Sequence, residues 1–208
     1  MTKYQKINSV FKRDPDARNK RFLLDEYSQP EIAYLADCLW LGTEKIDGMN
    51  IRIGANQIKG RTDNAQIPSF LYPVLTEIQN KLQITISQGS LPESTILYGE
   101  GYGKKIQKGE HYLPESNNFV LFDVSINEKY QPRSSVEDVS KKLDIPIAPI
   151  YGSYPLSEWV EITSSKKFKS SLLHPRANNE GFVLRPPVDL YNRNGDRIIT
   201  KLKFKDFQ

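Results

Sequence analysis

The sequence predicts an α+β fold in which mostly antiparallel strands are flanked by helices. Short runs that alternate polar and apolar residues, as at Ile51–Ile53, indicate strands with one buried face. The nearly all-apolar run Phe119–Val124 indicates a strand buried on both faces. Residues 68–82 carry apolar side chains at helical spacing. Because the chain has no internal repeat or long linker, we expect a single domain over residues 1–208.

The amino-terminal part of the chain is polar and rich in charge over residues 1–29, and residues 11–16 are predicted as a loop. Residues 31–40 predict a short helix, or a helix that leads into a strand, because Pro30 suits a first helical turn and the apolar residues recur at helical spacing.

A β-hairpin is predicted next, where the runs 51–53 and 57–59 flank the turn-forming residues 54–56. Arg61 follows directly after the second of these strands. The helix predicted at residues 68–82 tolerates its early proline if it begins near Tyr72. Its apolar face consists of Phe70, Leu71, Val74, Leu75, Ile78 and Leu82.

The carboxy-terminal half mixes predicted strands and helices. Ser134 and Glu137 match a capping box, which predicts a helix beginning there. Residues 152–155 indicate a turn, and residues 156–173 predict a helix whose second half is basic. Strands are expected at residues 95–97, running into 98–103, and at 119–124, 181–184 and 197–204.

The composition is that of an ordinary globular protein, with 38% hydrophobic and 26% charged residues. The formal net charge of +4 fits a phosphate-rich partner without requiring one. Cys38 is the only cysteine, which excludes an internal disulfide and a zinc site built on cysteines. Because the sequence has no signal peptide and no apolar run long enough to span a membrane, we expect a cytoplasmic protein without a membrane partner.

Lys45 lies between a predicted strand end and the turn-forming pair Asp47-Gly48. An amine attacks phosphorus or a carbonyl carbon only when it is deprotonated. A nucleophilic lysine therefore needs a site that lowers its pKa through burial or nearby positive charge. Taken alone, this stretch favours a hairpin turn with a solvated lysine.

Five other residue positions carry possible chemistry. Lys201 and Lys203 point to the same face of a predicted strand, and two neighbouring ammonium groups are best explained by a facing anion such as a polyphosphate. Glu100 lies between two glycines, which let a ligand approach closely, and its carboxylate suits ribose hydroxyls. Glu180 offers oxygens to a divalent cation. Phe122, judged by its apolar surroundings, is a core residue. Each position alone also fits an ordinary structural role.

Five short pieces occur in a characteristic order along the chain. They are Lys-x-Asp-Gly, Gly-Glu, Phe-Asp, Glu-Gly-Phe-Val and Lys-x-Lys, beginning at residues 45, 99, 122, 180 and 201. This series resembles the motifs of covalent nucleotidyltransferases, the superfamily of ATP-dependent DNA ligases, RNA ligases and mRNA capping enzymes. The resemblance spans Thr43–Phe207 and implies the nucleotidyltransferase (ATP-grasp-like) fold.

The resemblance also implies a role for each matching residue. Lys45 would attack the α-phosphate of ATP, keep AMP as a covalent adduct and release pyrophosphate, with Mg²⁺ or Mn²⁺ required. Lys201 and Lys203 would neutralise the phosphates, and Glu180 would act near the α-phosphate and bind the metal. The implied nucleotide contacts are Glu44 at the adenine, Glu100 at the ribose, Phe122 stacked on the base, and Asn50 and Arg61.

The position five residues after Lys45 distinguishes the branches of this superfamily. DNA ligases and capping enzymes usually have arginine there, whereas Asn50 is similar to the type-2 RNA ligases, which include the RNA-editing ligases. The stretch Glu180–Pro186 looks like that group as well. Asp47 departs from the group, which often has histidine at this position, and keeps a DNA ligase open.

We therefore expect a minimal ATP-dependent RNA ligase acting in RNA repair, with RNA ends favoured over DNA ends. The chain ends five residues after Lys203, so we expect no carboxy-terminal oligonucleotide-binding or helical domain, and a separate substrate-binding subunit remains open. A minimal DNA ligase and a nucleotide- or nucleic-acid-binding module without turnover are the alternatives. Lys166–Lys169, with His174 and Arg176, is a candidate nucleic-acid contact, although a solvated helix face is favoured.

Overall fold

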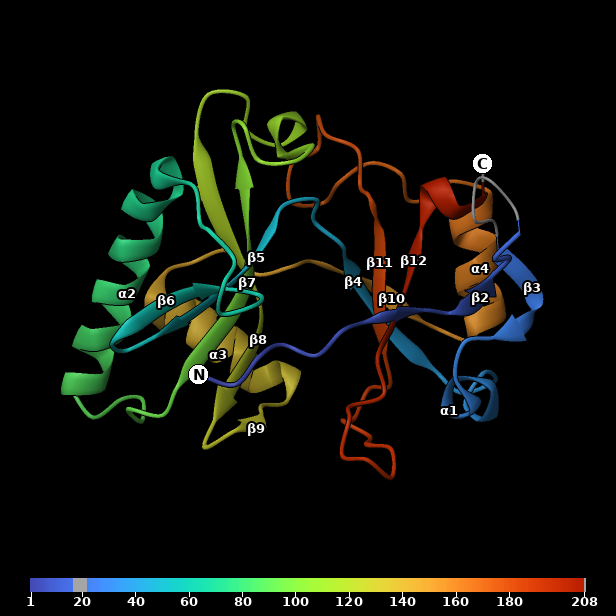
Figure 1. The fold of residues 1–208 in the computed structure, drawn as a ribbon, viewed down its shortest axis with the longest axis horizontal. Helices are drawn as coiled ribbons and strands as arrows, with labels where there is room; N and C mark the ends of the chain where they lie inside the picture. Colours follow the sequence, from blue (N-terminus) through green and yellow to red (C-terminus); the bar gives the residue numbers. More distant parts are fainter. Residues whose placement is uncertain (17–21, 208) are drawn as a thin grey trace. The chain divides into compact units, whose positions relative to one another are not determined.

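The strands and helices of this protein pack into two compact units in the computed structural model, which describes residues 1–16 and 22–207 (Figure 1). Unit 1 consists of Met1–Tyr4 and Ile46–Ala148, and unit 2 consists of Gln5–Lys45 and Pro149–Gln208. Residues 17–21, within the polar stretch 1–29, lie outside the described residues. The single domain expected from the sequence stays a prediction.

Unit 1 is built on a five-stranded antiparallel sheet. The order is β6 (Gln57–Gly60), β5 (Met49–Gly54), β7 (Ile96–Gly103), β8 (Asn117–Ile126) and β9 (Lys129–Tyr130). The predicted hairpin is confirmed as β5 and β6. The strands predicted at residues 95–103 and 119–124 are present as β7 and β8, and β8 is longer than predicted.

Two helices of unit 1, α2 (Tyr72–Ser87) and α3 (Arg133–Leu143), share one hydrophobic core with this sheet (Figure 1). As predicted, α2 begins at Tyr72 with a proline in its first turn, after a short 3-10 turn at Ser69–Leu71. A further 3-10 turn occupies Gly109–His111. The helix α3 is present, but the predicted capping box is wrong. Its N-cap is Pro132, and the Glu137 carboxylate accepts a hydrogen bond from Arg133 Nε at 2.9 Å instead.

Unit 2 contains a second five-stranded sheet, antiparallel except for the β1–β12 pair. Its order is β1 (Asn8–Ser9), β12 (Thr200–Lys203), β11 (Gly181–Arg185), β4 (Trp40–Glu44) and β10 (Ile150–Tyr154). A smaller sheet pairs β2 (Phe11–Arg13) with β3 (Phe22–Tyr27). The helices are α1 (Pro30–Tyr34) and α4 (Leu156–Ser164), and a 3-10 turn follows β12 at Phe204–Phe207.

Several predictions for unit 2 are wrong. Residues 11–13 form β2 rather than a loop, and the turn predicted at residues 152–155 is largely strand β10, paired with β4. The strand expected at residues 197–204 is confined to β12. The helix predicted over residues 156–173 ends at Ser164, because Lys166 adopts φ +61° and closes the end of the helix. Backbone bonds from Lys166 to Thr163 and from Lys167 to Ile162 complete this cap.

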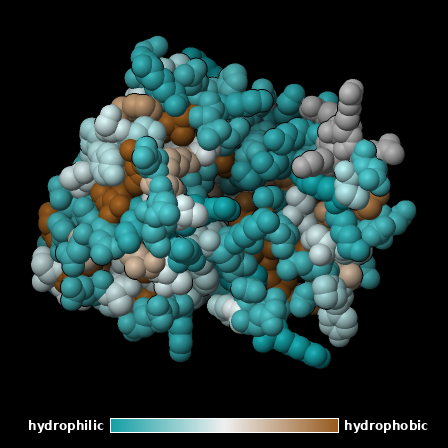
Figure 2. Space-filling view, viewed as in Figure 1, coloured by the Kyte–Doolittle hydropathy of each residue, from teal (hydrophilic) through white to brown (hydrophobic). Residues whose placement is uncertain are grey.

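The visible surface is mostly hydrophilic, with apolar side chains in scattered patches (Figure 2). Among the residues that the structure describes, no helix is both long and apolar enough to cross a membrane.

Candidate active site

The large sheet of unit 2 has an apolar face and a charged face. Glu44, Phe182 and Leu202 are register partners across β4, β11 and β12, and Phe182 and Leu202 pack in the core with α4. Because side chains alternate along a strand, Lys201 and Lys203 share one face, as predicted, and this is the face opposite Phe182 and Leu202. The core thus holds the strands from one side while the lysines project from the other.

Lys45, Glu180 and Lys203 form an ion-pair cluster at one end of β4, β11 and β12. Lys45 Nζ donates a hydrogen bond to Oε2 of Glu180, and Lys203 Nζ donates one to Oε1. The three side chains retain 21%, 13% and 18% of their exposure, respectively. The Lys45 backbone is held by a 2.9 Å bond from its amide to the carbonyl of Gly181. One carboxylate therefore bridges two lysines from different strand ends.

Lys201 adds a third ammonium group to this cluster. Burial, together with the charges of Lys203 and Lys45, lowers the pKa of Lys201 to about 8. Burial works to raise the pKa of Glu180, but the charge of Lys45 and the hydrogen bond from Lys203 outweigh it and lower that pKa. Three lysines around one ionised carboxylate leave an excess of positive charge, which suits an anion such as a phosphate group.

Glu44 lies on the apolar face and is 3% exposed. Its Oε2 accepts hydrogen bonds from the amides of Leu172 at 2.9 Å and Leu173 at 3.3 Å, and from the Tyr151 hydroxyl at 3.3 Å. Within the described residues, Oε1 is buried without a hydrogen-bond partner. Burial and the Glu44 charge raise the pKa of Tyr151. Burial lowers the pKa of His174, and the Glu44 charge opposes this shift without cancelling it. The buried carboxylate thus ties a loop to the strand end that precedes Lys45.

Unit 1 carries the other residues predicted for nucleotide binding. Asn50 and Glu100 are register partners on β5 and β7, so they share a face of the sheet. Asn50 Oδ1 is buried and has no hydrogen-bond partner among the described residues, as expected of an atom that contacts a ligand. The glycines on either side of Glu100 are explained by close packing against core side chains rather than by close approach of a ligand. A Cβ at Gly99 would lie 2.1 Å from the Phe119 ring, and one at Gly101 would lie 2.6 Å from a Leu71 methyl.

Phe122 lies at a β-bulge. The β7–β8 register passes from Tyr98 opposite Asp123 to Gly99 opposite Leu121, which leaves Phe122 without a partner strand residue. The bulge turns Phe122 and Asp123 toward the same face, and Phe122 is half-buried and outside the hydrophobic core cluster. The Tyr4 ring packs edge-on against it at 5.0 Å between centroids, and the Tyr4 hydroxyl donates to Asp123. The assignment of Phe122 to the core by its apolar surroundings is therefore wrong.

Arg61 lies in the turn after β6, as expected. Arg52, which is fully buried, fixes this turn by donating to the Gly60 carbonyl at 2.9 Å and to Asp63 Oδ1 at 3.0 Å. Tyr4, Arg52 and Tyr151 hold candidate site residues in place and were not singled out from the sequence. Tyr4 and Tyr151 act through partners more than 100 residues away, and Arg52 acts through the turn after β6, so no local sequence motif marks these roles.

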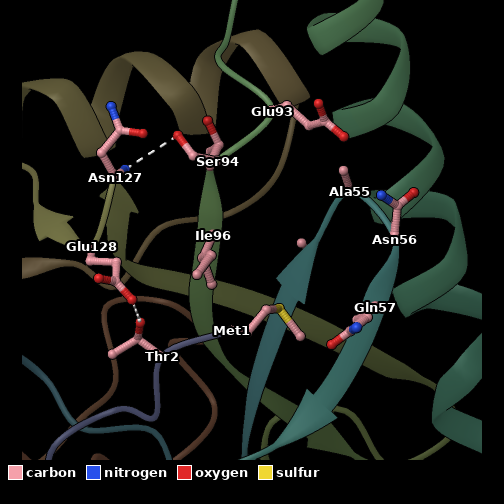
Figure 3. Close-up of a pocket in the computed structure, with 12 residues that line it drawn as sticks. Met1, Thr2, Ala55, Asn56, Gln57, Glu93, Ser94, Ile96, Asn127 and Glu128 are labelled. Atoms are coloured by element: carbon pink, nitrogen blue, oxygen red, sulfur yellow. Dashed lines mark hydrogen bonds between the residues drawn. The ribbon is translucent and has the colours of Figure 1, made fainter.

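A pocket of about 770 Å³ lies at the end of the unit 1 sheet that is away from Asn50 and Glu100 (Figure 3). Figure 3 shows Glu128 accepting a hydrogen bond from Thr2, at 3.1 Å, near Ile96 of β7. Glu100 lies four residues after Ile96 along β7, a span of about 13 Å in a strand. None of the predicted site residues lines this pocket.

Solved structures with a similar fold include RNA ligases. The Naegleria gruberi RNA ligase with PPi is 18% identical, with a TM-score of 0.66 over 98% of this chain and 56% of that chain. A mutant of that ligase with AMP and Mn has a TM-score of 0.67 at 16% identity, over 98% and 56% of the two chains. An archaeal ATP-dependent RNA ligase has a TM-score of 0.63 at 14% identity, over 99% and 49%.

These matches define the class: the protein has the nucleotidyltransferase fold of RNA ligases, with antiparallel sheets and few helices. The chain spans about half to 60% of the length of the ligases that it matches. The family model described as RNA ligase matches residues 39–203, so the chain belongs to the RNA ligase family. A search of curated proteins finds no match.

Proposed function

We propose that this protein is an ATP-dependent RNA ligase that joins 5′-phosphate and 3′-hydroxyl ends through a covalent lysyl-AMP at Lys45. The observation that carries the proposal is the cluster of Lys45, Glu180 and Lys203 in a chain of the RNA ligase family. A strand-end lysine held by a carboxylate, within a positively charged surrounding, is suited to attack a phosphate.

In the first step, the Lys45 amine attacks the α-phosphorus of ATP. A nitrogen–phosphorus bond forms, the bond to the bridging oxygen breaks, and pyrophosphate leaves with its electron pair. The amine must first lose a proton, and Glu180, already hydrogen-bonded to it, is placed to accept that proton. Lys201 and Lys203 offset the negative charge on the phosphates, and such positioning and neutralisation are the main sources of catalysis in phosphoryl transfer.

The later steps use the adenylylated enzyme. AMP passes from Lys45 to the 5′-phosphate of one strand, and the 3′-hydroxyl of the other strand then displaces AMP as the strands join. Glu44, Asn50, Arg61, Glu100 and Phe122 are proposed as nucleotide contacts by their match to the family motifs. Asn50 also supports assignment to the type-2 RNA ligases. A cytoplasmic location and a separate substrate-binding subunit are further parts of the hypothesis.

A divalent cation is compatible with the residues present. In the described part of the chain, no cluster of three or more acidic, histidine or cysteine side chains forms a protein-only metal cage. Mg²⁺ is commonly bound through one or two carboxylates together with substrate phosphates, and Glu180 supplies such a carboxylate. The cation, when bound, would draw charge from the phosphate oxygens.

The test is incubation with ATP labelled at the α-phosphate, with Mg²⁺ or Mn²⁺, followed by denaturing electrophoresis and intact-mass analysis. We expect covalent AMP on the wild type and none on Lys45→Ala. Lys142→Ala, which removes an exposed lysine of α3 far from the motifs in sequence, serves as the matched control and should label normally. Folded wild-type protein that acquires no label with either metal would refute the proposed lysyl-AMP chemistry.

Strand choice is tested next with the labelled enzyme. Nicked duplexes and single-stranded ends with RNA or DNA on the 3′-hydroxyl side are compared for joining. Joining only with RNA at that side supports the RNA ligase assignment, whereas equal joining with DNA favours the DNA ligase alternative that Asp47 keeps open.

A further inference from the structure

Residues 166–179 of unit 2, which we call the cationic loop, concentrate positive charge. The sequence contains no carboxylate between Glu161 and Glu180, and the four cations in the loop equal the formal net charge of the entire chain, +4. They are Lys166, Lys167, Lys169 and Arg176.

These four residues are exposed, and among the described residues none of their side chains forms an ion pair with a carboxylate. The prediction that these residues lie on a solvated helix face is wrong, because α4 ends at Ser164, before the first of them. A solvated helix face therefore no longer explains this group. Like charges gathered on one short loop repel each other, and an anion facing the loop relieves that repulsion.

Backbone hydrogen bonds order the loop as a hairpin. The Asn179 amide donates to the Lys169 carbonyl at 2.7 Å, and the Ser171 amide donates to the Ala177 carbonyl at 3.0 Å. The turn closes through a 2.8 Å bond from the Ala177 amide to the His174 carbonyl. A loop that is already ordered loses little conformational freedom when it binds a ligand.

The tip of the hairpin is attached to the strand that leads to Lys45. Glu44 accepts hydrogen bonds from the amides of Leu172 and Leu173. The Tyr151 hydroxyl lies within hydrogen-bond distance of both the Glu44 carboxylate and the Ser170 carbonyl. Glu44 is the residue directly before the proposed nucleophile. An anionic chain bound along the cationic loop would therefore be held beside that strand end.

We propose that the cationic loop binds the sugar–phosphate backbone of the RNA strand on which Lys45 acts. This inference rests on the proposed function and adds the surface that holds the strand. Contacts from lysine and arginine to phosphates are independent of base sequence and strongly dependent on salt. The loop should consequently contribute to affinity and to the salt dependence of binding, and it should contribute nothing to formation of the lysyl-AMP.

The experiment compares Lys169→Ala/Arg176→Ala with Lys141→Ala/Lys142→Ala, which removes two exposed lysines from α3 of unit 1. Both variants lose the same charge. A fluorescent, 5′-phosphorylated single-stranded RNA is titrated at several salt concentrations, a DNA of the same sequence is run alongside, and labelling by α-labelled ATP is measured on the same preparations.

For the loop variant, the slope of log affinity against log salt should fall by about 1.4, with RNA binding about 25-fold weaker at about 0.1 M salt. The α3 variant should bind as the wild type does, and both should label with AMP normally. Unchanged RNA affinity and slope in the loop variant, or the same loss in both variants, would overturn the inference. A wild type that binds RNA but fails to label would refute the proposed ligase chemistry while leaving the binding result readable.

Discussion

Removal of the Glu44 carboxylate tests how the strand end before Lys45 is stabilised. Oε2 accepts two backbone amides and one hydroxyl, and these donors lose their partner in Glu44→Ala. Each lost bond costs about 1 kcal/mol, so the free energy of unfolding should fall by about 3 kcal/mol. For a chain of this length, that is a drop of roughly 6–12 °C in Tm.

Glu44→Gln separates charge from hydrogen bonding. The glutamine oxygen can occupy the position of Oε2 and keep all three bonds, and its amide group then takes the place of Oε1, which has no hydrogen-bond partner among the described residues. Only the additional strength of a charged acceptor is lost, about 1 kcal/mol. The order of stability should therefore be wild type, Glu44→Gln and Glu44→Ala.

Urea unfolding gives these free energies, and amide hydrogen exchange at Leu172 and Leu173 locates the change. Exchange at both amides should accelerate in Glu44→Ala and remain close to wild type in Glu44→Gln. Glu161→Ala removes an exposed carboxylate from α4 and should stay within about 0.5 kcal/mol of the wild type. The reasoning fails if Glu44→Ala matches that control in both measurements.

Substitutions at three further positions test other features of the structure. Gly42→Ala places a Cβ about 2.2 Å from the Trp159 ring, so urea unfolding should show a loss of about 1–3 kcal/mol; an unchanged midpoint would contradict this packing. The folded chain releases the Lys201 proton near pH 8, whereas the unfolded chain holds it to about pH 10.5. Stability should therefore gain a rising contribution between these values that Lys201→Met lacks, and identical pH profiles of Tm would refute it. Tyr4→Phe keeps the ring against Phe122 whereas Tyr4→Ala removes it, so only the second should weaken ATP binding several-fold in a nucleotide titration; equal affinities would exclude a positioning role.

The sequence predicts well the features that depend on strand alternation. Lys201 and Lys203 share a face because two residues are one period of a strand, and the hairpin at β5 and β6 follows from its two alternating runs and intervening glycine. The face taken by Phe122 was not predictable, because a bulge in β8 changes the alternation at this residue. A bulge depends on the register between two strands, and neither strand alone encodes it.

The error at residues 152–155 has a related cause. Gly152 and the flanking proline suggest a turn, yet Gly152 adopts φ +147° at an irregularity in the pairing of β10 with β4. Glycine is used here to bend an edge strand. The end of α4 was missed because its cap depends on Lys166 in the left-handed region, a conformation that lysine rarely adopts.

The two faces of the unit 2 sheet explain why the lysine cluster can exist. Burial is the main cause of the lowered pKa of Lys201, and the charges of Lys203 and Lys45 add to it, so gathering the three lysines around one carboxylate is unfavourable in the absence of a bound anion. The opposite face of the same strands compensates by burying Phe182 and Leu202 in the core with α4. Because the strands are fixed from that side, the backbone positions of the three lysines stay close together. A bound polyphosphate would remove the repulsion, so ATP should raise the Tm of the wild type more than that of Lys201→Met.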